Sequence, residues 1–222
     1  MNQLLETSVT FDQYTEAFGE TIYMVSISLL IGALLGIPLA VVLVLTRPGG
    51  LKPIPWLYTI LNIIVNIIRS IPFIILLVAI VPLTRLISGT SIGTTAALVP
   101  LTIYIAPYIS RLIEASLLEV RSGILEAADS MGATLWQTIQ IFMLPEAKSS
   151  IILALTTATI GLIGATAMAG TIGGGGVGDL AVSYGYQQFD APAIVITVLI
   201  LVIVVQGIQS IGNLLARRTR FH

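Results

Sequence analysis

Hydrophobic and polar positions along this chain alternate in long blocks rather than at short spacing. Four stretches contain no Asp, Glu, Lys or Arg, namely residues 21–45, 86–110, 149–178 and 191–216. Between 53 and 84, only Arg69 interrupts a further apolar run. A helix needs about 20 mostly apolar residues to cross a bilayer. The pattern therefore predicts an all-α integral membrane protein with five transmembrane helices, at about 20–45, 57–82, 92–112, 150–170 and 191–214.

The composition supports this class and excludes several others. Of the 222 residues, 56% are hydrophobic and 9% are charged, whereas a soluble domain carries about 25% charged residues. The ten Lys and Arg residues do not exceed the eleven Asp and Glu residues, so no basic excess points to nucleic acid. The chain has no Cys, and its single His is His222. We therefore predict no catalytic residues, no metal site and no cofactor.

The placement of Lys and Arg predicts the orientation, because cytoplasmic segments retain positive residues. With the N-terminus outside, the inner segments hold eight of the ten basic residues: Arg47, Lys52, Arg111, Arg121, Lys148, Arg217, Arg218 and Arg220. Arg85 lies outside and Arg69 within a span. Residues 1–19 are then an extracytoplasmic segment, which lacks the basic region of a cleavable signal peptide, and 215–222 form a basic cytoplasmic tail.

The longest polar stretch is the inner loop 113–149, between the third and fourth spans. Apolar or small residues recur there at helical spacing, at Leu125, Ala128, Gly132 and Leu135. The lack of a Cβ at Gly132 permits a sharp turn or the close approach of another backbone. We therefore expect two short helices that meet at Gly132.

Local signals place the second short helix of this loop. Thr134 followed by Gln137 predicts a capping box at its start, and Pro145 is expected to end it. Two interpretations of the loop remain open from these residues alone. It is either a docking element for another protein or an amphipathic segment resting on lipid.

A run of residues in the inner loop resembles the EAA loop of ABC importer permeases. The residues that carry the resemblance are Glu126, Ala127, Ala128, Gly132, Ile141, Leu144 and Pro145. Elsewhere Thr46–Gly49, Arg69–Phe73 and Gly170–Gly178 followed by Tyr184–Tyr186 are similar to the methionine-importer permease subfamily. The similarity covers nearly the whole chain.

The resemblance implies a function and a set of partners. Residues 20–214 would form an ABC transmembrane type-1 domain, and the chain would be a homodimeric permease subunit in the bacterial cytoplasmic (inner) membrane. Two cytoplasmic ATPase subunits would hydrolyse ATP, so the chain itself is not an enzyme. A substrate-binding lipoprotein would deliver a small amino acid, with methionine expected, from outside. The seven residues of the EAA resemblance would couple the permease to the ATPase.

The fourth span carries candidates for the translocation path. Gly161, Ala165 and Ala169 repeat every four residues, a spacing that permits close helix packing. Met168 is a candidate gate residue, although a gap-filling role in packing is an equal alternative. Gly164 and Ala165 are candidates for lining the path beside it.

Arg69 and the outer loop 171–190 each have two interpretations. Arg69 shares a helix face with Asn62 and Asn66, and we favour a structural role near the inner surface over contact with substrate. The sequence GGGGVG at 173–178 is not expected to bind nucleotide, because Asp179 follows it where a P-loop has Lys. We expect a flexible or tightly packed loop there.

The alternative class is a secondary transporter or channel for a small neutral solute that works alone. Ion-coupled carriers place acidic residues or His near the membrane midplane, and no Asp or Glu lies near the middle of any predicted span. Co-purification with an ATPase would discriminate between the two classes.

Overall fold

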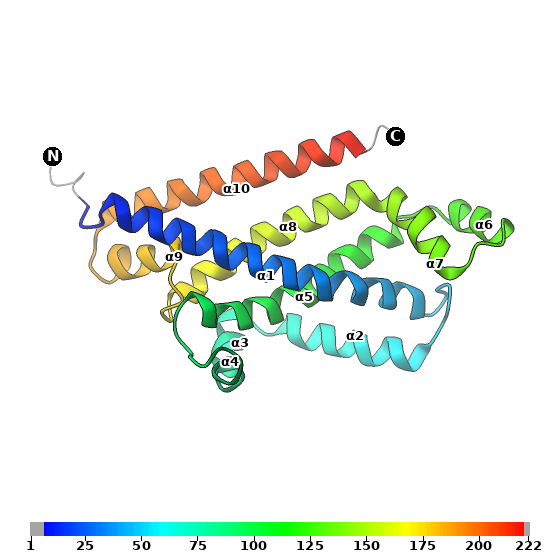
Figure 1. Cartoon of the computed structure of the whole chain (residues 1–222), viewed down its shortest axis with the longest axis horizontal. Helices are drawn as coiled ribbons and strands as arrows, with labels where there is room; N and C mark the ends of the chain where they lie inside the picture. The colour runs from blue at the N-terminus through cyan, green and yellow to red at the C-terminus, as the bar shows by residue number, and fades with distance from the viewer. Residues whose placement is uncertain (1–6, 220–222) are drawn as a thin grey trace.

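The computed structural model describes residues 7–219 and contains only helices over that range. In chain order they are α1 (Phe11–Thr46), α2 (Pro55–Ser70), α3 (Phe73–Ala79), α4 (Val81–Ser88), α5 (Thr94–Leu118), α6 (Ser122–Ser130), α7 (Leu135–Gln137), the π-helical η2 (Thr138–Met143), α8 (Leu144–Gly170), α9 (Val177–Leu180), the π-helical η3 (Ala181–Tyr186) and α10 (Ala191–Thr219). The long helices run lengthwise beside one another (Figure 1). The all-α prediction is confirmed.

The chain passes from one end of this bundle to the other five times. Four continuous helices are long and apolar enough to cross a membrane, namely Phe11–Thr46, Thr94–Leu118, Leu135–Gly170 and Ala191–Thr219. The fifth pass is the bent pair α2 and α3. Successive passes alternate in direction, so α1 begins at one end and α10 finishes at the other (Figure 1). The predicted number of spans is confirmed when the bent pair counts as one.

The two ends of the bundle differ in what they carry. We call the end with residues 47–54, 119–137 and the C-terminal part of α10 the loop end. We call the end with the start of α1, the start of α5 and residues 171–190 the glycine end (Figure 1). The predicted orientation places the loop end in the cytoplasm.

The second span is not the continuous helix expected over 57–82. It breaks between α2 and α3, and the two helices are bent by 102°. Pro72 has no N–H to donate and disfavours the helical conformation of the residue before it. Ile71 is accordingly extended, with φ −83° and ψ 122°. Hydropathy alone did not show the break because the run stays apolar on both sides of it.

The other spans extend beyond the predicted bounds. The helix containing α1 starts at Phe11 rather than near 20, because Thr10 and Gln13 form a capping box. At the loop end, α5 continues to Leu118 instead of 112, and α10 continues to Thr219 instead of 214. The expected terminal segments 1–19 and 215–222 are therefore partly helical, and residues 1–6 and 220–222 lie outside the described residues. Hydropathy marks only the apolar part of a helix, and these helices continue into segments that contain charged residues.

The core lies where α1, α5 and α8 meet. Gly32 and Gly36 are four residues apart on α1, the spacing that lets two membrane helices approach closely. A Cβ on Gly36 would lie 2.5 Å from the carbonyl oxygen of Ala106 on α5. Close backbone packing at this crossing holds α5 in place, and α5 in turn positions both its tyrosines and the loop that follows it.

Candidate functional site

The inner loop contains one short helix, α6, and a second helix that begins at Leu135, and the predicted turn at Gly132 joins them. Gly132 has φ +70°, the left-handed region that glycine enters without steric cost. The predicted capping box at Thr134 is also present, because its amide N–H donates to Gln137 Oε1 at 2.8 Å and its Oγ1 accepts from the Gln137 N–H. Local sequence signals therefore determined this turn.

Pro145 does not end the second short helix, contrary to expectation. The helix beginning at Leu135 continues through η2 into α8, so that one helix runs to Gly170. Pro145 is the second residue of α8. A proline ring removes one backbone hydrogen bond and crowds the preceding turn, and the wider π-helical turns of η2 accommodate such a local mismatch. The fourth span and the second helix of the inner loop are therefore one continuous helix.

Contacts on one side of the loop fix it to the rest of the chain. Ala128 is completely buried, and Ile124 and Leu125 pack against the core. An ion pair of 3.5 Å joins the exposed side chains of Arg121 and Glu146. At this exposure such a pair contributes little stability, so the apolar contacts hold the loop.

The opposite side of the loop exposes large apolar side chains. Met131 is 66% exposed, Trp136 64% and Ile141 61%, and Leu135 is also exposed. We call these four residues the loop surface. A Cβ on Gly132 would meet nothing within 4 Å in this chain. Exposed apolar patches in water indicate contact with another molecule.

The residues of the EAA resemblance divide between these two sides. Glu126, Ala127, Gly132, Ile141 and Pro145 are exposed. In contrast, Ala128 is buried and Leu144 is half-buried, so these two support the loop from within. The large exposed side chains of Met131 and Trp136 were not among the predicted site residues. Two large apolar residues in a polar loop were the available signal.

Within the bundle, α8 presents one uncovered stripe. Gly164 and Met168 are exposed on it, and a Cβ on Gly164 would meet nothing within 4 Å. Ala165 is only 3% exposed and packs inside the chain. The structure therefore brings Gly164 and Met168 to one face and places Ala165 on another.

Aromatic side chains from α5 continue this face. A Cβ on Gly161, one turn from Gly164, would lie 3.7 Å from the Tyr108 ring. The ring of Tyr108 stacks on that of Tyr104, with centroids 6.1 Å apart. The ring of Tyr104 also lies edge-on to that of Phe73, with centroids 5.1 Å apart, and Phe73 comes four residues after Arg69. Residues from α3, α5 and α8 therefore meet on one side of the subunit.

The polar residues on one face of α2 differ in whether they have hydrogen-bond partners. Arg111 of α5 donates hydrogen bonds to Asn62 and, at 2.9 Å, to Asn66 Oδ1. It also forms an ion pair with Glu114 at 2.6 Å. Arg111 therefore lies inside the bundle, although the sequence suggested an inner-loop position. Arg69, on the same stripe, has no hydrogen bond or ion pair within residues 7–219.

The outer loop 171–190 is tightly packed, one of the two expected alternatives. The Gly176 N–H donates to Glu20 Oε2 at 2.7 Å, and the Val177 N–H donates to Thr21 Oγ1 at 2.9 Å. A Cβ on Gly170 would lie 2.5 Å from the Asp179 nitrogen. The glycines here allow backbone to pack on backbone within one chain. No strand precedes them in the part of the chain that the structure describes, so a P-loop geometry is absent there.

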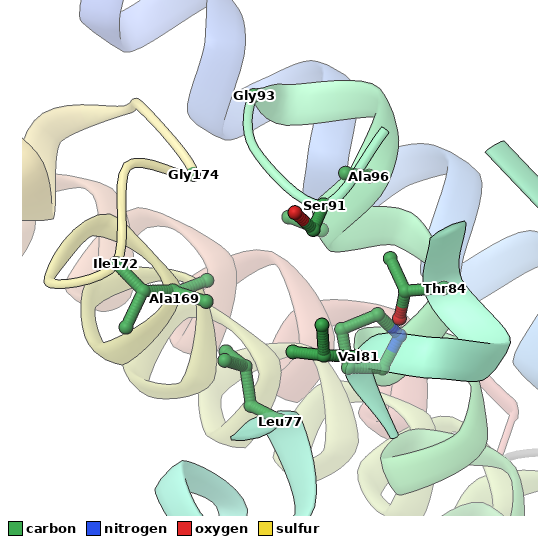
Figure 2. A pocket seen from close by; sticks show the side chains of 11 residues that line it. Leu77, Val81, Thr84, Ser91, Gly93, Ala96, Ala169, Ile172 and Gly174 are labelled. Atoms are coloured by element: carbon green, nitrogen blue, oxygen red, sulfur yellow. The ribbon is translucent and has the colours of Figure 1, made fainter. Parts of the chain in front are cut away.

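A cavity beside this loop is too small for a substrate. It lies where α3, α4 and the start of α5 meet the outer loop 171–190 (Figure 2). Its lining residues include Leu77, Thr84, Ser91 and Ile172. Its volume of about 10 Å³ holds one water molecule at most. Among residues 7–219, no group of three or more His, Cys, Asp or Glu residues is arranged to hold a metal ion.

Comparison with known proteins shows similarity along nearly the whole chain. A family model described as a binding-protein-dependent transport system inner membrane component matches residues 32–221. The probable D-methionine transport system permease protein MetI of Vibrio cholerae serotype O1 is 50% identical over 207 residues, which are 93% of this chain and 92% of that protein. The corresponding protein of Pasteurella multocida is 43% identical over 90% of this chain and 92% of its own length.

Solved structures show the same fold. A structure described as an inward-facing conformation of the MetNI methionine ABC transporter matches with a TM-score of 0.93 and 41% identity, covering 96% of this chain and 99% of that one. An amino acid ABC transporter crystallised with histidines matches with a TM-score of 0.77 at 20% identity, over 93% and 94% of the two chains. The second likeness concerns the fold alone.

Proposed function

This chain belongs to the family of binding-protein-dependent transport system inner membrane components, and on that premise we propose that it is the membrane subunit of an ATP-driven importer of methionine. Five passes through the membrane, in alternating directions, suit a subunit that surrounds a path for a small solute. ATP hydrolysis belongs to partner subunits that bind at the loop end.

The loop surface is the observation that carries this proposal. Met131, Leu135, Trp136 and Ile141 are exposed beside a glycine turn that has open space around it. A monomeric soluble surface rarely leaves large apolar residues uncovered in this way. We assign the exposed Glu126, Ala127 and Pro145 to the same docking surface, with Ala128 and Leu144 supporting it from below.

The continuous helix from Leu135 to Gly170 gives the docking surface a route to the membrane path. A movement of the ATPase at Leu135 would be transmitted along one rigid element to Gly164 and Met168. Two copies of the subunit, facing each other across these residues, would alternate between inward-open and outward-open states. Two ATPase subunits and an extracytoplasmic binding lipoprotein would complete the transporter.

Methionine as the substrate is supported by the relatives. Three relatives described as probable D-methionine permeases are 41–50% identical over at least 90% of this chain. The exposed face around Tyr104, Tyr108 and Met168 is compatible with a thioether side chain, since sulfur makes favourable contacts with aromatic rings. The proposed cargo is the free amino acid.

Reconstitution tests this function. The chain should be co-expressed with its ATPase, purified and placed in proteoliposomes with the binding protein, and the uptake of D- and L-methionine should be measured with and without ATP. We expect ATP-dependent uptake and methionine-stimulated ATP hydrolysis. A chain that purifies without an ATPase and transports solute down its gradient would instead support the stand-alone transporter or channel.

The orientation is tested on the same complex, because the chain has no native Cys. Phe11→Cys, at the exposed start of α1, should react with a membrane-impermeant thiol reagent in cells with a permeable outer membrane. Arg218→Cys should react only after the inner membrane is opened. The reverse pattern would place the loop end outside and would contradict docking to a cytoplasmic ATPase.

A further inference from the structure

The position of Arg69 along α2 favours a place within the membrane over the expected place near the inner surface. Helix α2 begins at the loop end with Pro55, and Arg69 is in its last turn. At 1.5 Å per residue it lies about 21 Å along the helix axis, in a hydrocarbon core of about 30 Å. An arginine side chain cannot reach the loop-end surface from there.

The charge of Arg69 has no partner within residues 7–219. Asn62 and Asn66, its neighbours on the same stripe, are bonded to Arg111. The side chain of Arg69 is exposed. An ionised group at this depth is costly unless it faces water, a protein partner or a ligand. The exposed face around Arg69 therefore needs water or an anion beside it.

The groups around Arg69 suit one class of ligand. A guanidinium binds a carboxylate through two parallel hydrogen bonds. The half-buried rings of Tyr104 and Tyr108 stack on each other, and Tyr104 contacts Phe73 just beyond the end of α2. The faces of such rings attract an ammonium group and also contact thioether sulfur. An α-amino acid with an apolar side chain carries all the complementary groups.

We propose that Arg69, beside Tyr104 and Tyr108, forms a subsite that binds the α-carboxylate of the amino acid in transit. This inference rests on the proposed function and assigns a substrate contact to it. A single guanidinium without a second cationic group makes a weak site, which suits a path because the cargo must also leave it. The exposed stripe of Gly164 and Met168 on α8 borders the same face, so the subsite would lie beside the candidate gate.

Ser70 provides a reporter next to Arg69. Its side chain is exposed, and its hydroxyl only donates to the Asn66 carbonyl oxygen of the same helix, at 2.7 Å. In Ser70→Cys, the sole thiol of the permease would face the proposed water-filled side. Ile64→Cys is the matched control. Ile64 is also exposed on α2, but its side chain points about 120° away from that of Ser70 around the helix axis.

The experiment measures the rate at which a membrane-impermeant maleimide modifies each variant, in the nucleotide-free complex with its ATPase in nanodiscs. We expect Ser70→Cys to react at least tenfold faster than Ile64→Cys. Saturating methionine should slow the reaction of Ser70→Cys several-fold, whereas methioninol, which has no carboxylate, should not. Adding Arg69→Gln should abolish the protection by methionine, and Arg69→Lys should retain part of it.

Three results would overturn the subsite. The first is no reaction at Ser70→Cys, because the face would then be dry. The second is equal protection by methionine and methioninol, and the third is full protection in the Arg69→Gln background. ATP-driven methionine uptake by the parent complex, measured separately, distinguishes these outcomes from failure of the proposed function. If the parent transports methionine and protection is absent, only the Arg69 subsite is wrong.

Discussion

Two connections between spans, residues 119–137 at the loop end and 171–190 at the glycine end, use glycine for opposite purposes. Both contain glycines in the left-handed region, with φ +70° at Gly132 and +86° at Gly176. A Cβ on Gly132 would meet nothing within 4 Å, whereas one on Gly176 would lie 2.7 Å from Thr21 Oγ1. The space around Gly132 is open, and that around Gly176 is filled by the chain itself.

The difference shows how to separate glycines that serve the fold from those that serve a partner. At the glycine end, the backbone packs on α1 and α8, and Glu20 and Thr21 accept its N–H groups. At the loop end, apolar side chains stay exposed around the turn. Substitutions at the first should therefore change stability, and substitutions at the second should change assembly.

The largest effect is expected for Gly178→Ala at the glycine end. A Cβ there would overlap the backbone of Ala167 on α8, and backbone cannot move aside as a flexible side chain does. Overpacking costs about 1–3 kcal/mol, and each kcal/mol lowers the melting temperature by about 2–4 °C for a domain of this size. Thermal unfolding of the purified permease in detergent should show this loss. Gly207→Ala is the control, since nothing lies within 4 Å of that position, and an equal melting temperature for both variants would contradict the comparison.

Gly132→Trp should act on assembly instead. Nothing lies within 4 Å of a Cβ at Gly132, but its φ of +70° strains any other residue. Gly132→Trp and Gly132→Ala should therefore lower the melting temperature of the permease by the same small amount. The docked ATPase would obstruct the Trp side chain, and an overpacking cost of about 1–3 kcal/mol reduces association roughly five- to hundredfold. Pull-down of the ATPase by tagged permease measures the loss, with Gly132→Ala expected to be milder and Gly123→Ala as the control in the same loop. ATPase retained at parental levels would mean that the loop surface is not the docking site.

Met168→Ala tests whether an exposed residue near the glycine end also affects function rather than stability. Met168 is 48% exposed on the stripe that we place at the membrane path, so truncation should leave the fold and the ATPase contact intact. Basal ATP hydrolysis or methionine leak should rise about two- to fivefold, because a flexible side chain no longer narrows the path. Hydrolysis and leak at parental levels, with an unchanged melting temperature, would assign Met168 to ordinary packing.

The smallest expected effect is on stability, from Asp190 just before the start of α10. The pKa of Asp190 is lowered to about 2 because its carboxylate accepts several hydrogen bonds. The donors are the hydroxyl and amide of Ser8, the Ala193 amide and the Thr7 hydroxyl. The stability contributed by a carboxylate with a lowered pKa is fully present above its unfolded pKa and is lost as pH falls through the folded value. Between pH 5 and 8, the difference in melting temperature between Asp190→Asn and the parent should stay constant. A difference that varies over this range would show that another group sets the pH dependence.

How far the sequence predicted this protein depended on the kind of signal. Blocks of apolar residues predicted five passes, because the hydrocarbon core requires a minimum length of apolar helix. Thr134 with Gln137 predicted a capping box and Gly132 a turn, because both are local. Pro145 was misread as a helix end, since a π-helical segment before it allowed the helix to continue.

The sequence by itself determined the class of protein, the number of passes and the turn at Gly132, because composition and backbone chemistry act over a few residues. Only the tertiary structure decided which residues face outward. It turned Ala165 inward and Met168 outward, bonded Asn62 and Asn66 to Arg111, and left Arg69 without a partner in the described chain. These outcomes depend on how α2, α5 and α8 pack, and helical spacing fixes only which residues share a face.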